Sequence, residues 1–212
     1  MPNSVGLSVV EQRMTPQNGL KEQYSIDPKA SQFTVQAFAS GLISAVAHSP
    51  KIAIRGWKAD VSFYPDTLSD ATLKVVIRSG SLEVLDDLRE SDRRELHRVM
   101  YDDVLEVKRF PEVVFESSYI GAERLKDNLN RINVEGKLSL HGATNGQTFF
   151  SQVAFGVDSF RAYGEFSLLQ SDYGIRIASI AGGTLKLQDE LKFNFYVVGR
   201  KQAISTQSAT AT

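Results

Sequence analysis

Hydrophobic and polar residues alternate along most of this chain with a period of two. In the stretch SQFTVQAFA (31–39), Phe33 and Val35 fall on one face, while Thr34 and Gln36 fall on the other. This alternation is typical of a β-strand that buries one of its faces. Similar stretches occur at residues 58–64, 71–79, 111–120, 132–140, 148–157, 160–169 and 184–199. The pattern therefore predicts about eight strands.

A closed barrel is the arrangement that best suits strands of this kind. A single open sheet would leave two free edges and an uncovered apolar face, and closure of the sheet removes both problems. The interior of a barrel of about eight strands holds either packed side chains or one elongated ligand. We therefore predict an all-β fold, an extended antiparallel β-barrel of about eight strands.

One segment, SDRRELHRVMYDDVLEV (91–107), departs from the alternation. Leu96, Met100 and Val104 recur in it at helical spacing, and Ser91 is a suitable N-cap residue. We expect a helix over about residues 91–106, on the connection before Pro111, that lies outside the barrel or plugs one of its ends.

The sequence LHGATNG (140–146) separates two of the predicted strands. Asn145-Gly146 is a frequent signal for a type I′ hairpin, because both central residues of that turn need a positive φ. We therefore expect the hairpin to turn at Asn145-Gly146, with Gly142 adding freedom nearby. His141 would then lie where the strand leaves the barrel wall and fix this corner through hydrogen bonds of its ring nitrogens.

Composition and charge narrow the choice of function. The 212 residues fit one domain, and we expect a flexible N-terminal arm over 1–23, a barrel domain over 24–202 and a disordered tail over 203–212. The chain has no cysteine, which excludes disulfides and thiol chemistry. Its net charge of -1 gives no reason to expect nucleic acid or an anionic membrane as a partner. The chain shows neither a long apolar run nor a secretory signal pattern, so we expect no integral membrane segment and a cytoplasmic location.

Four short motifs resemble those of a known family, and they follow one another in the expected order. GKLSLHGAT (136–144) resembles the G-x-L-T-L-H-G-V-T stretch of the YceI-like family, the lipocalin-like polyisoprenoid-binding proteins. Further resemblances lie in YSIDPKAS (24–31), RFPEVVFESSYI (109–120) and SDYGIR (171–176). Together the motifs extend over roughly residues 24 to 200.

The resemblance implies a lipocalin-like barrel with an apolar tunnel that binds a long isoprenoid lipid, such as a polyprenyl quinone or a polyprenyl phosphate. Some members of the family pair as homodimers, and many are exported. This chain departs from the family at three places. Ala30-Ser31 stands where the family has His-Ser, the apolar run AFASGLISAVAH (37–48) replaces a second family histidine, and Asn145-Gly146 replaces a basic residue followed by proline. The resemblance therefore says less about the head group of the lipid than about its hydrocarbon chain.

Apolar residues on the inner faces of the predicted strands are the candidate ligand-binding residues. From the residues alone, a barrel filled by these side chains is favoured over a cavity; the resemblance favours a cavity. His48, next to Ser49-Pro50, is a candidate for the mouth of the barrel. The candidate cavity lining is Phe33, Val35, Phe63, Leu73, Val75, Ile77, Val113, Phe115, Val134, Leu138, Phe155, Phe166, Phe193 and Phe195.

We therefore predict a protein without enzymatic activity that binds a polyisoprenoid or quinone-like lipid in its interior, for storage or transfer. Apart from that hydrophobic ligand we expect no cofactor and no metal, because the histidines lack metal-ligand spacing. One alternative is a packed barrel without ligand that acts through homo-oligomerisation, a homodimer for example, or through a protein partner, and that uses its helix or an edge of the sheet. The run AFASGLISAVAH, which is unusually apolar for a connection, supports this alternative. A second alternative, an enzyme, would need His48 or Tyr163 to face the cavity.

Overall fold

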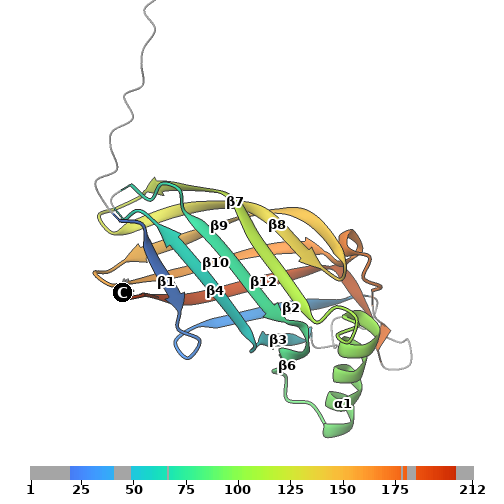
Figure 1. The fold of residues 1–212 in the computed structure, drawn as a ribbon. Helices are drawn as coiled ribbons and strands as arrows, with labels where there is room; N and C mark the ends of the chain where they lie inside the picture. The colour runs from blue at the N-terminus through green and yellow to red at the C-terminus, as the bar shows by residue number, and fades with distance from the viewer. Residues whose placement is uncertain (1–19, 41–48, 66, 178, 181–184, 204–212) are drawn as a thin grey trace, which may run out of the picture.

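The computed structural model describes residues 20–40, 49–65, 67–177, 179–180 and 185–203. Eight strands form a closed antiparallel barrel, in which β1 pairs with both β4 and β12 and so completes the ring (Figure 1). These strands are β1 (Glu22–Ile26), β4 (Trp57–Phe63), β5 (Thr72–Arg78), β7 (Glu112–Arg124), β8 (Leu129–Leu140), β9 (Ala143–Phe155), β10 (Ser159–Leu169) and β12 (Leu185–Lys201). The predicted all-β barrel is confirmed.

Four further strands belong to the same sheet. The path continues from β12 through β2 (Gln32–Ser40) and β3 (Lys51–Ile54) to β6 (Leu82–Val84), while β11 (Ser179–Ile180) pairs with β12 alone. The turn η1 (Ser79–Ser81) joins β5 to β6. Each of the eight predicted stretches contains a strand, but one of them is β2, and β1 takes its place in the closed ring. Strands of three to five residues are too short for an alternation to stand out.

The two ends of the barrel differ in what closes them. At the aromatic end, named for Tyr24, Phe63, Phe155 and Phe160, these four rings pack together in the core. At the helical end lie α1 (Glu90–Arg98), the π-helical turn η2 (Val99–Val104) and the short helix η3 (Gln170–Tyr173). Figure 1 shows the aromatic end on the left, beside β1, and α1 on the right.

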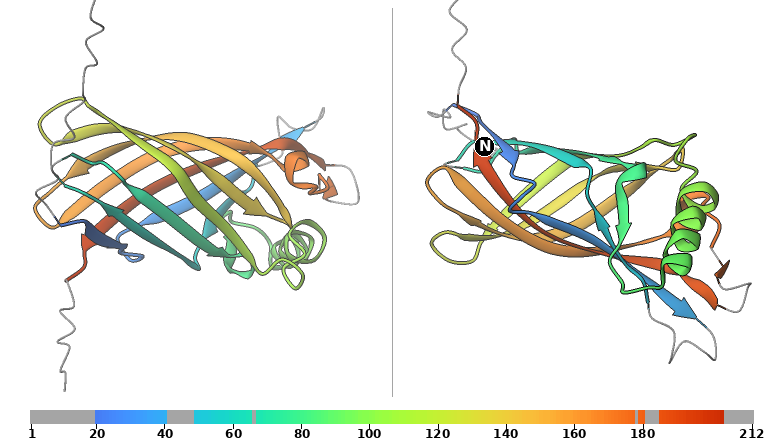
Figure 2. Two further views of the ribbon diagram at one scale, coloured as in Figure 1. Left: turned by 45° about the horizontal axis from the view of Figure 1, so that its top comes forward. Right: turned by 90° about the horizontal axis from the view of Figure 1, so that it is seen from below.

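The helix lies outside the barrel, against β6 (Figure 2). The guanidinium of Arg93 donates to the carbonyl oxygens of Val84 and Asp86 at 3.2 and 3.1 Å, and the Tyr101 hydroxyl lies 2.8 Å from the Gly80 carbonyl oxygen. Backbone groups at the edge of the sheet are satisfied in this way. The predicted helix before Pro111 is confirmed.

The predicted N-cap of this helix was wrong. The helix begins at Glu90 and its N-cap is Arg89, in an extended conformation, so Ser91 lies inside the first turn. The first turn also carries the carboxylates of Glu90 and Asp92, which are favourable near the positive end of a helix dipole. The Ser91 hydroxyl donates to Oδ1 of Asp92 at 3.2 Å instead of capping the backbone.

The predicted hairpin corner in LHGATNG is confirmed, but the expected turn at Asn145-Gly146 was wrong. The chain turns at His141 and Gly142, whose φ angles are 53° and 80°, and Asn145-Gly146 lies within β9. Gly142 suits the turn for two reasons, its positive φ and its position under the Phe110 ring, where an added Cβ would lie 2.8 Å from Cε1. The turn therefore comes four residues earlier, where Phe110 packs against it.

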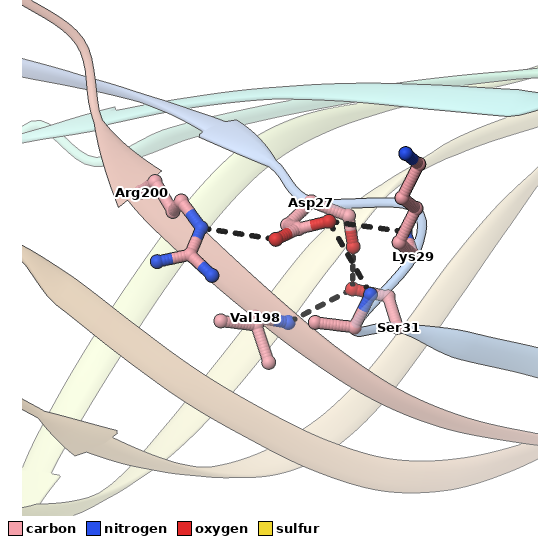
Figure 3. A network of polar contacts seen from close by, with 6 residues as sticks. Asp27, Lys29, Ser31, Val198 and Arg200 are labelled. Carbon is pink, nitrogen blue, oxygen red and sulfur yellow. Dashed lines mark hydrogen bonds and ion pairs between the residues drawn. The ribbon is translucent and has the colours of Figure 1, made fainter.

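The strand β12 changes its partner within the barrel wall. It pairs with β2 as far as Tyr196, opposite Gln32, and with β1 from Gly199, opposite Ile26. Residues 27–31 leave the wall between these two pairings. The N–H of Asp27 donates to the Val198 carbonyl oxygen at 2.8 Å, and the Val198 N–H donates to the Ser31 hydroxyl at 3.0 Å. The hydrogen bonds of β12 therefore continue past the loop (Figure 3).

Side chains of Asp27 and Ser31 fix the shape of this loop. Oδ1 of Asp27 accepts the N–H groups of Lys29 and Ala30 at 3.0 and 3.3 Å, and the Ser31 hydroxyl donates to the Asp27 carbonyl oxygen at 2.6 Å. Nε of Arg200 donates to Oδ2 of Asp27 at 3.0 Å. The Arg200 hydrogen bond holds the pKa of the Asp27 carboxyl below its usual range. The motif YSIDPKAS thus closes the barrel.

Candidate ligand-binding cavity

The barrel encloses a cavity of about 210 Å³. No charged side chain lines it, and Gln147 and Ser151 are its only polar lining residues among the part of the chain that the structure describes. The Ser151 hydroxyl donates to the Tyr163 carbonyl oxygen at 3.1 Å, so it has no further proton to donate to a ligand. A wall of this kind offers a dry environment for a hydrocarbon.

Phenylalanine rings make up much of the wall in the middle of the barrel. The rings of Phe166 and Phe193 stack with their centroids 4.8 Å apart, and Phe149 packs 5.3 Å from Phe166 and 5.8 Å from Phe195. Since the strands are antiparallel and alternate in and out, residues from β9, β10 and β12 meet here on one inner surface.

Two glycines let rings lie close to the wall instead of filling the interior. Gly164 stands opposite Phe195, and Gly199 stands opposite Phe160 on paired strands. A Cβ added at Gly164 would lie 2.7 Å from Cζ of Phe195, and one at Gly199 would lie 2.2 Å from Cε1 of Phe160. Each ring therefore occupies the space that a side chain on the facing strand would need. This arrangement leaves room along the barrel axis.

The rim of the aromatic end carries a small polar network. The Tyr24 hydroxyl donates to Oε2 of Glu22 at 2.7 Å, and Glu22 forms an ion pair with Lys201. Burial, together with the Glu22 carboxylate, raises the pKa of Tyr24 well above its usual range. Burial alone would raise the pKa of Glu22, but hydrogen bonds from Lys201 and Tyr24 outweigh it, and the pKa is lowered. The charges at this rim compensate each other.

The corner at the helical end is built around His141. Its Nδ1 lies 3.3 Å from the Tyr173 carbonyl oxygen, its Nε2 lies 3.4 Å from Oε1 of Glu106, and its ring centroid lies 4.4 Å from that of Phe110. The ring thus connects the hairpin turn to η3 and to the segment before β7. The contact of Nδ1 confirms the expectation that His141 fixes this corner.

The structure places twelve of the fourteen candidate lining residues at the cavity wall. Val35 is buried where β2 pairs with β3, Val113 packs near the helical end, and neither is among the lining residues. His48 lies outside the described residues. The residues at the wall are Phe33, Phe63, Leu73, Val75, Ile77, Phe115, Val134, Leu138, Phe155, Phe166, Phe193 and Phe195.

Sequence reasoning missed several lining residues. Gln147 and Ser151 point inward because they share the phase of Phe149 on β9, a signal that was available in the alternation. Ile26, Leu68 and Ala71 come from a short strand and from the loop after β4, where no alternation indicates a direction. Trp57 also lines the cavity and is the only tryptophan of the chain.

The structure bears on both alternative functions, the packed barrel without ligand and the enzyme. A packed barrel would have a filled interior, and the cavity argues against it. Tyr163, one of the two residues that an enzyme would need, is 49% exposed on the outer face and donates to Oε1 of Gln152.

No group of three potential metal ligands comes together in the ranges that the structure covers. None of the helices described is long and apolar enough to cross a membrane.

The fold and its cavity define the class of the protein, a lipocalin-like β-barrel with an apolar interior. The chain belongs to the YceI-like domain family, whose family model matches residues 24–199. No curated protein matches the chain by sequence.

Solved structures of the same fold agree with this assignment. BcnA from Burkholderia cenocepacia has a TM-score of 0.63 and 20% identity, over 82% of this chain and 98% of that chain. A polyisoprenoid-binding domain from Saccharophagus degradans has a TM-score of 0.61 and 13% identity, over 84% and 98%. The YceI protein of Campylobacter jejuni has a TM-score of 0.56 and 13% identity, over 74% and 87%. At these identities the similarity concerns the fold.

Proposed function

We propose that the protein binds the hydrocarbon chain of a polyisoprenoid or quinone-like lipid inside the barrel, for storage or transfer. The observation that carries this proposal is the uncharged cavity wall, which is polar only at Gln147 and Ser151 among its described residues. Burial of hydrocarbon contributes about 0.8 kcal/mol per CH₂ group, whereas a buried polar group without a partner is costly. The family and the polyisoprenoid-binding domain with the same fold support the proposal.

The size of the cavity limits how much of a lipid it holds. Pockets for small molecules typically have volumes of about 300–1,000 Å³, so a cavity of about 210 Å³ holds only part of a long isoprenoid chain. A longer chain must either displace the phenylalanine rings or extend beyond the cavity.

Two neighbouring valines on β5 provide a matched test. Val75 lines the cavity, and Val76 belongs to the opposite face of the same strand. Val75→Thr keeps the shape of the side chain but places a hydroxyl in the apolar wall, and we expect it to weaken binding of farnesol by about fivefold or more. Val76→Thr should leave the affinity unchanged. Emission of Trp57 reports binding, and calorimetry checks it.

A second variant blocks the cavity directly. Ala162 is 6% exposed and lines the cavity from β10, so the ring in Ala162→Phe would occupy space that the ligand needs. We expect at least a tenfold loss of farnesol binding, with circular dichroism used to show that the barrel still folds. Unchanged affinity in folded Ala162→Phe and in Val75→Thr would contradict binding in this cavity.

A further inference from the structure

The wall of the barrel splits at the helical end, between β9 and β10. These strands pair from Phe155 opposite Phe160 as far as Phe150 opposite Glu165. Beyond that point β9 runs on to Ala143 paired only with β8, and β10 runs on to Leu169 paired only with β12. We call the gap between residues 145–149 of β9 and residues 166–169 of β10 the window.

At the window, the apolar cavity and a second depression share two lining residues. Gln147 and Leu168 line the apolar cavity and also line a second depression, of about 320 Å³, on the outer side. They would face each other if the pairing of β9 with β10 continued in register. The other residues around the depression are Asn145, Gly146, Ser167, Leu169, Asp172, Tyr173 and Glu190.

Polar contacts hold η3 over the window. Nδ2 of Asn145 donates to the Asp172 carbonyl oxygen at 2.7 Å, and Nε2 of Gln170 donates to the Gln188 carbonyl oxygen at 3.0 Å. η3 directly follows β10 in the chain, so its contact with Asn145 of β9 spans the gap, while its contact with β12 lies on the far side of β10. The window is therefore bridged by η3 and by side chains, where the rest of this wall has a backbone ladder.

The chemistry of the depression differs from that of the cavity. It contains two exposed carboxylates, those of Asp172 and Glu190, and neither has an ion-pair partner within the described part of the chain. Among the residues that the structure describes, no lysine or arginine lines it. Nε2 of Gln147 donates to the Thr148 carbonyl oxygen at 3.2 Å, which leaves its second N–H and its carbonyl oxygen for a ligand. Burial, with Asp172 close by, raises the pKa of Tyr173, so this phenol stays neutral.

We propose that the head group of the bound lipid leaves the cavity through the window and lies in the depression, which takes an uncharged head that donates hydrogen bonds, such as an alcohol or a hydroquinone, and disfavours a phosphate. This inference rests on the proposed function. A hydroxyl finds carboxylate and amide acceptors there, whereas a phosphate meets two like charges without a cation to compensate them.

Farnesol and farnesyl phosphate, which share one tail, test the choice of head group. The native chain should bind farnesol more tightly, but the apolar cavity would favour the alcohol in any case. The decisive variant is Asp172→Asn with Glu190→Gln, which should strengthen binding of farnesyl phosphate at least fivefold at low salt and should not strengthen binding of farnesol, since the hydroxyl then meets only neutral acceptors. Glu123→Gln with Asp127→Asn removes the same charge from exposed positions at the aromatic end and should change neither affinity.

Each outcome of that experiment has a distinct meaning. Equal gains in the two double variants, or no gain in either, would overturn the assignment of the depression while leaving lipid binding intact. Failure of the native chain to bind either probe would contradict the proposed function itself.

A reversible cross-link tests the window. The chain has no cysteine, so Gln147→Cys with Leu168→Cys can be bridged by a bifunctional thiol reagent that a reductant cleaves. We expect the bridge to slow farnesol exchange at least tenfold and reduction to restore the rate. Gln152→Cys with Tyr163→Cys bridges a paired position on the outer face and should have no effect. Equal exchange rates in the two bridged proteins would overturn the passage through the window.

Discussion

The two ends of the barrel are closed by different kinds of interaction. At the aromatic end the Tyr24 and Phe63 rings stack with centroids 4.8 Å apart, Phe155 and Phe160 pack against them, and Lys201 pairs with Glu22 at the rim. At the helical end the wall splits between β9 and β10, where a polar contact joins η3 to β9, and α1 lies against the edge of the sheet at β6.

This difference suggests separate roles for the two ends, one for the stability of the barrel and the other for access of a ligand to the cavity. Burial of aromatic rings contributes several kcal/mol per residue, whereas a hydrogen bond on the surface contributes about 1 kcal/mol. Both ends bury apolar side chains, Tyr173 and Ile175 among them at the helical end, but only the helical end has a gap in its strand pairing. We therefore expect the aromatic end to be the more stable one, and we propose that a ligand enters and leaves at the helical end.

The largest effect is expected from truncation of the aromatic end. Phe63→Ala removes a ring that is 4% exposed and should lower the free energy of unfolding by about 3–5 kcal/mol. Phe110→Ala removes a half-buried ring at the helical end and should cost about 1–2 kcal/mol, since less area leaves water. Urea unfolding followed by circular dichroism measures the free energy of unfolding of both variants. Equal losses would contradict the difference in stability between the two ends.

The loop between β1 and β2 ranks second. Ser31→Ala leaves the Val198 N–H, which is half-buried, without its acceptor. We expect a cost of about 1–2 kcal/mol, in the lower part of the range for a buried donor without a partner. Ser118→Ala, which removes an exposed hydroxyl at the bulge of β7, should change the free energy of unfolding by less than about 0.5 kcal/mol. A loss for Ser31→Ala no larger than that for Ser118→Ala would show that the loop does not support the pairing of β12.

A smaller effect is expected where α1 and η2 meet the sheet. Tyr101→Phe removes the hydroxyl near the Gly80 and Leu82 carbonyl oxygens and should cost about 0.5–1.5 kcal/mol. Tyr119→Phe, at a side chain that is 57% exposed, is the matched control and should be neutral. Hydrogen exchange should show the loss as faster exchange confined to 90–110 in Tyr101→Phe, and uniform acceleration over the barrel would speak against a local role.

The smallest effect depends on pH. The pKa of Asp27 is lowered in the folded protein, chiefly by the Arg200 hydrogen bond, so its contribution is present above the unfolded pKa of about 3.9 and is lost as pH falls through the lower folded value. Asp27→Asn lacks this charge. The difference in free energy of unfolding between the native chain and Asp27→Asn should therefore stay constant from pH 7 to about pH 5 and vanish near pH 2. A difference independent of pH would mean that the charge of Asp27 plays no part.

Most of the barrel could be predicted because one face of each long strand is buried, and that burial leaves a period of two in the sequence. The same alternation predicted that Phe193 and Phe195 point into the barrel, and both line the cavity. The alternation could not indicate β1, β3 and β6, because these strands are too short. It could not locate the hairpin turn either, because the Phe110 ring and a positive φ at Gly142 determine that position.

The alternation by itself could predict neither the open interior, which only the family resemblance favoured, nor the window. Alternation gives the direction of a side chain but not what lies opposite it. The rings of Phe195 and Phe160 lie near the wall only because Gly164 and Gly199 face them, and that depends on register. The alternation of β9 and β10 likewise continues unchanged through the residues where they stop pairing.

Binding of a lipid in the cavity is the central claim, and mass spectrometry of an organic extract tests it most directly. The protein purified from its own cells, the Ala162→Phe variant and an unrelated barrel would be extracted in parallel. We expect a lipid with an isoprenoid chain at close to one molecule per native protein, and its loss from the folded variant and the unrelated barrel. A clean extract from folded native protein, or equal lipid in all three, would contradict the claim.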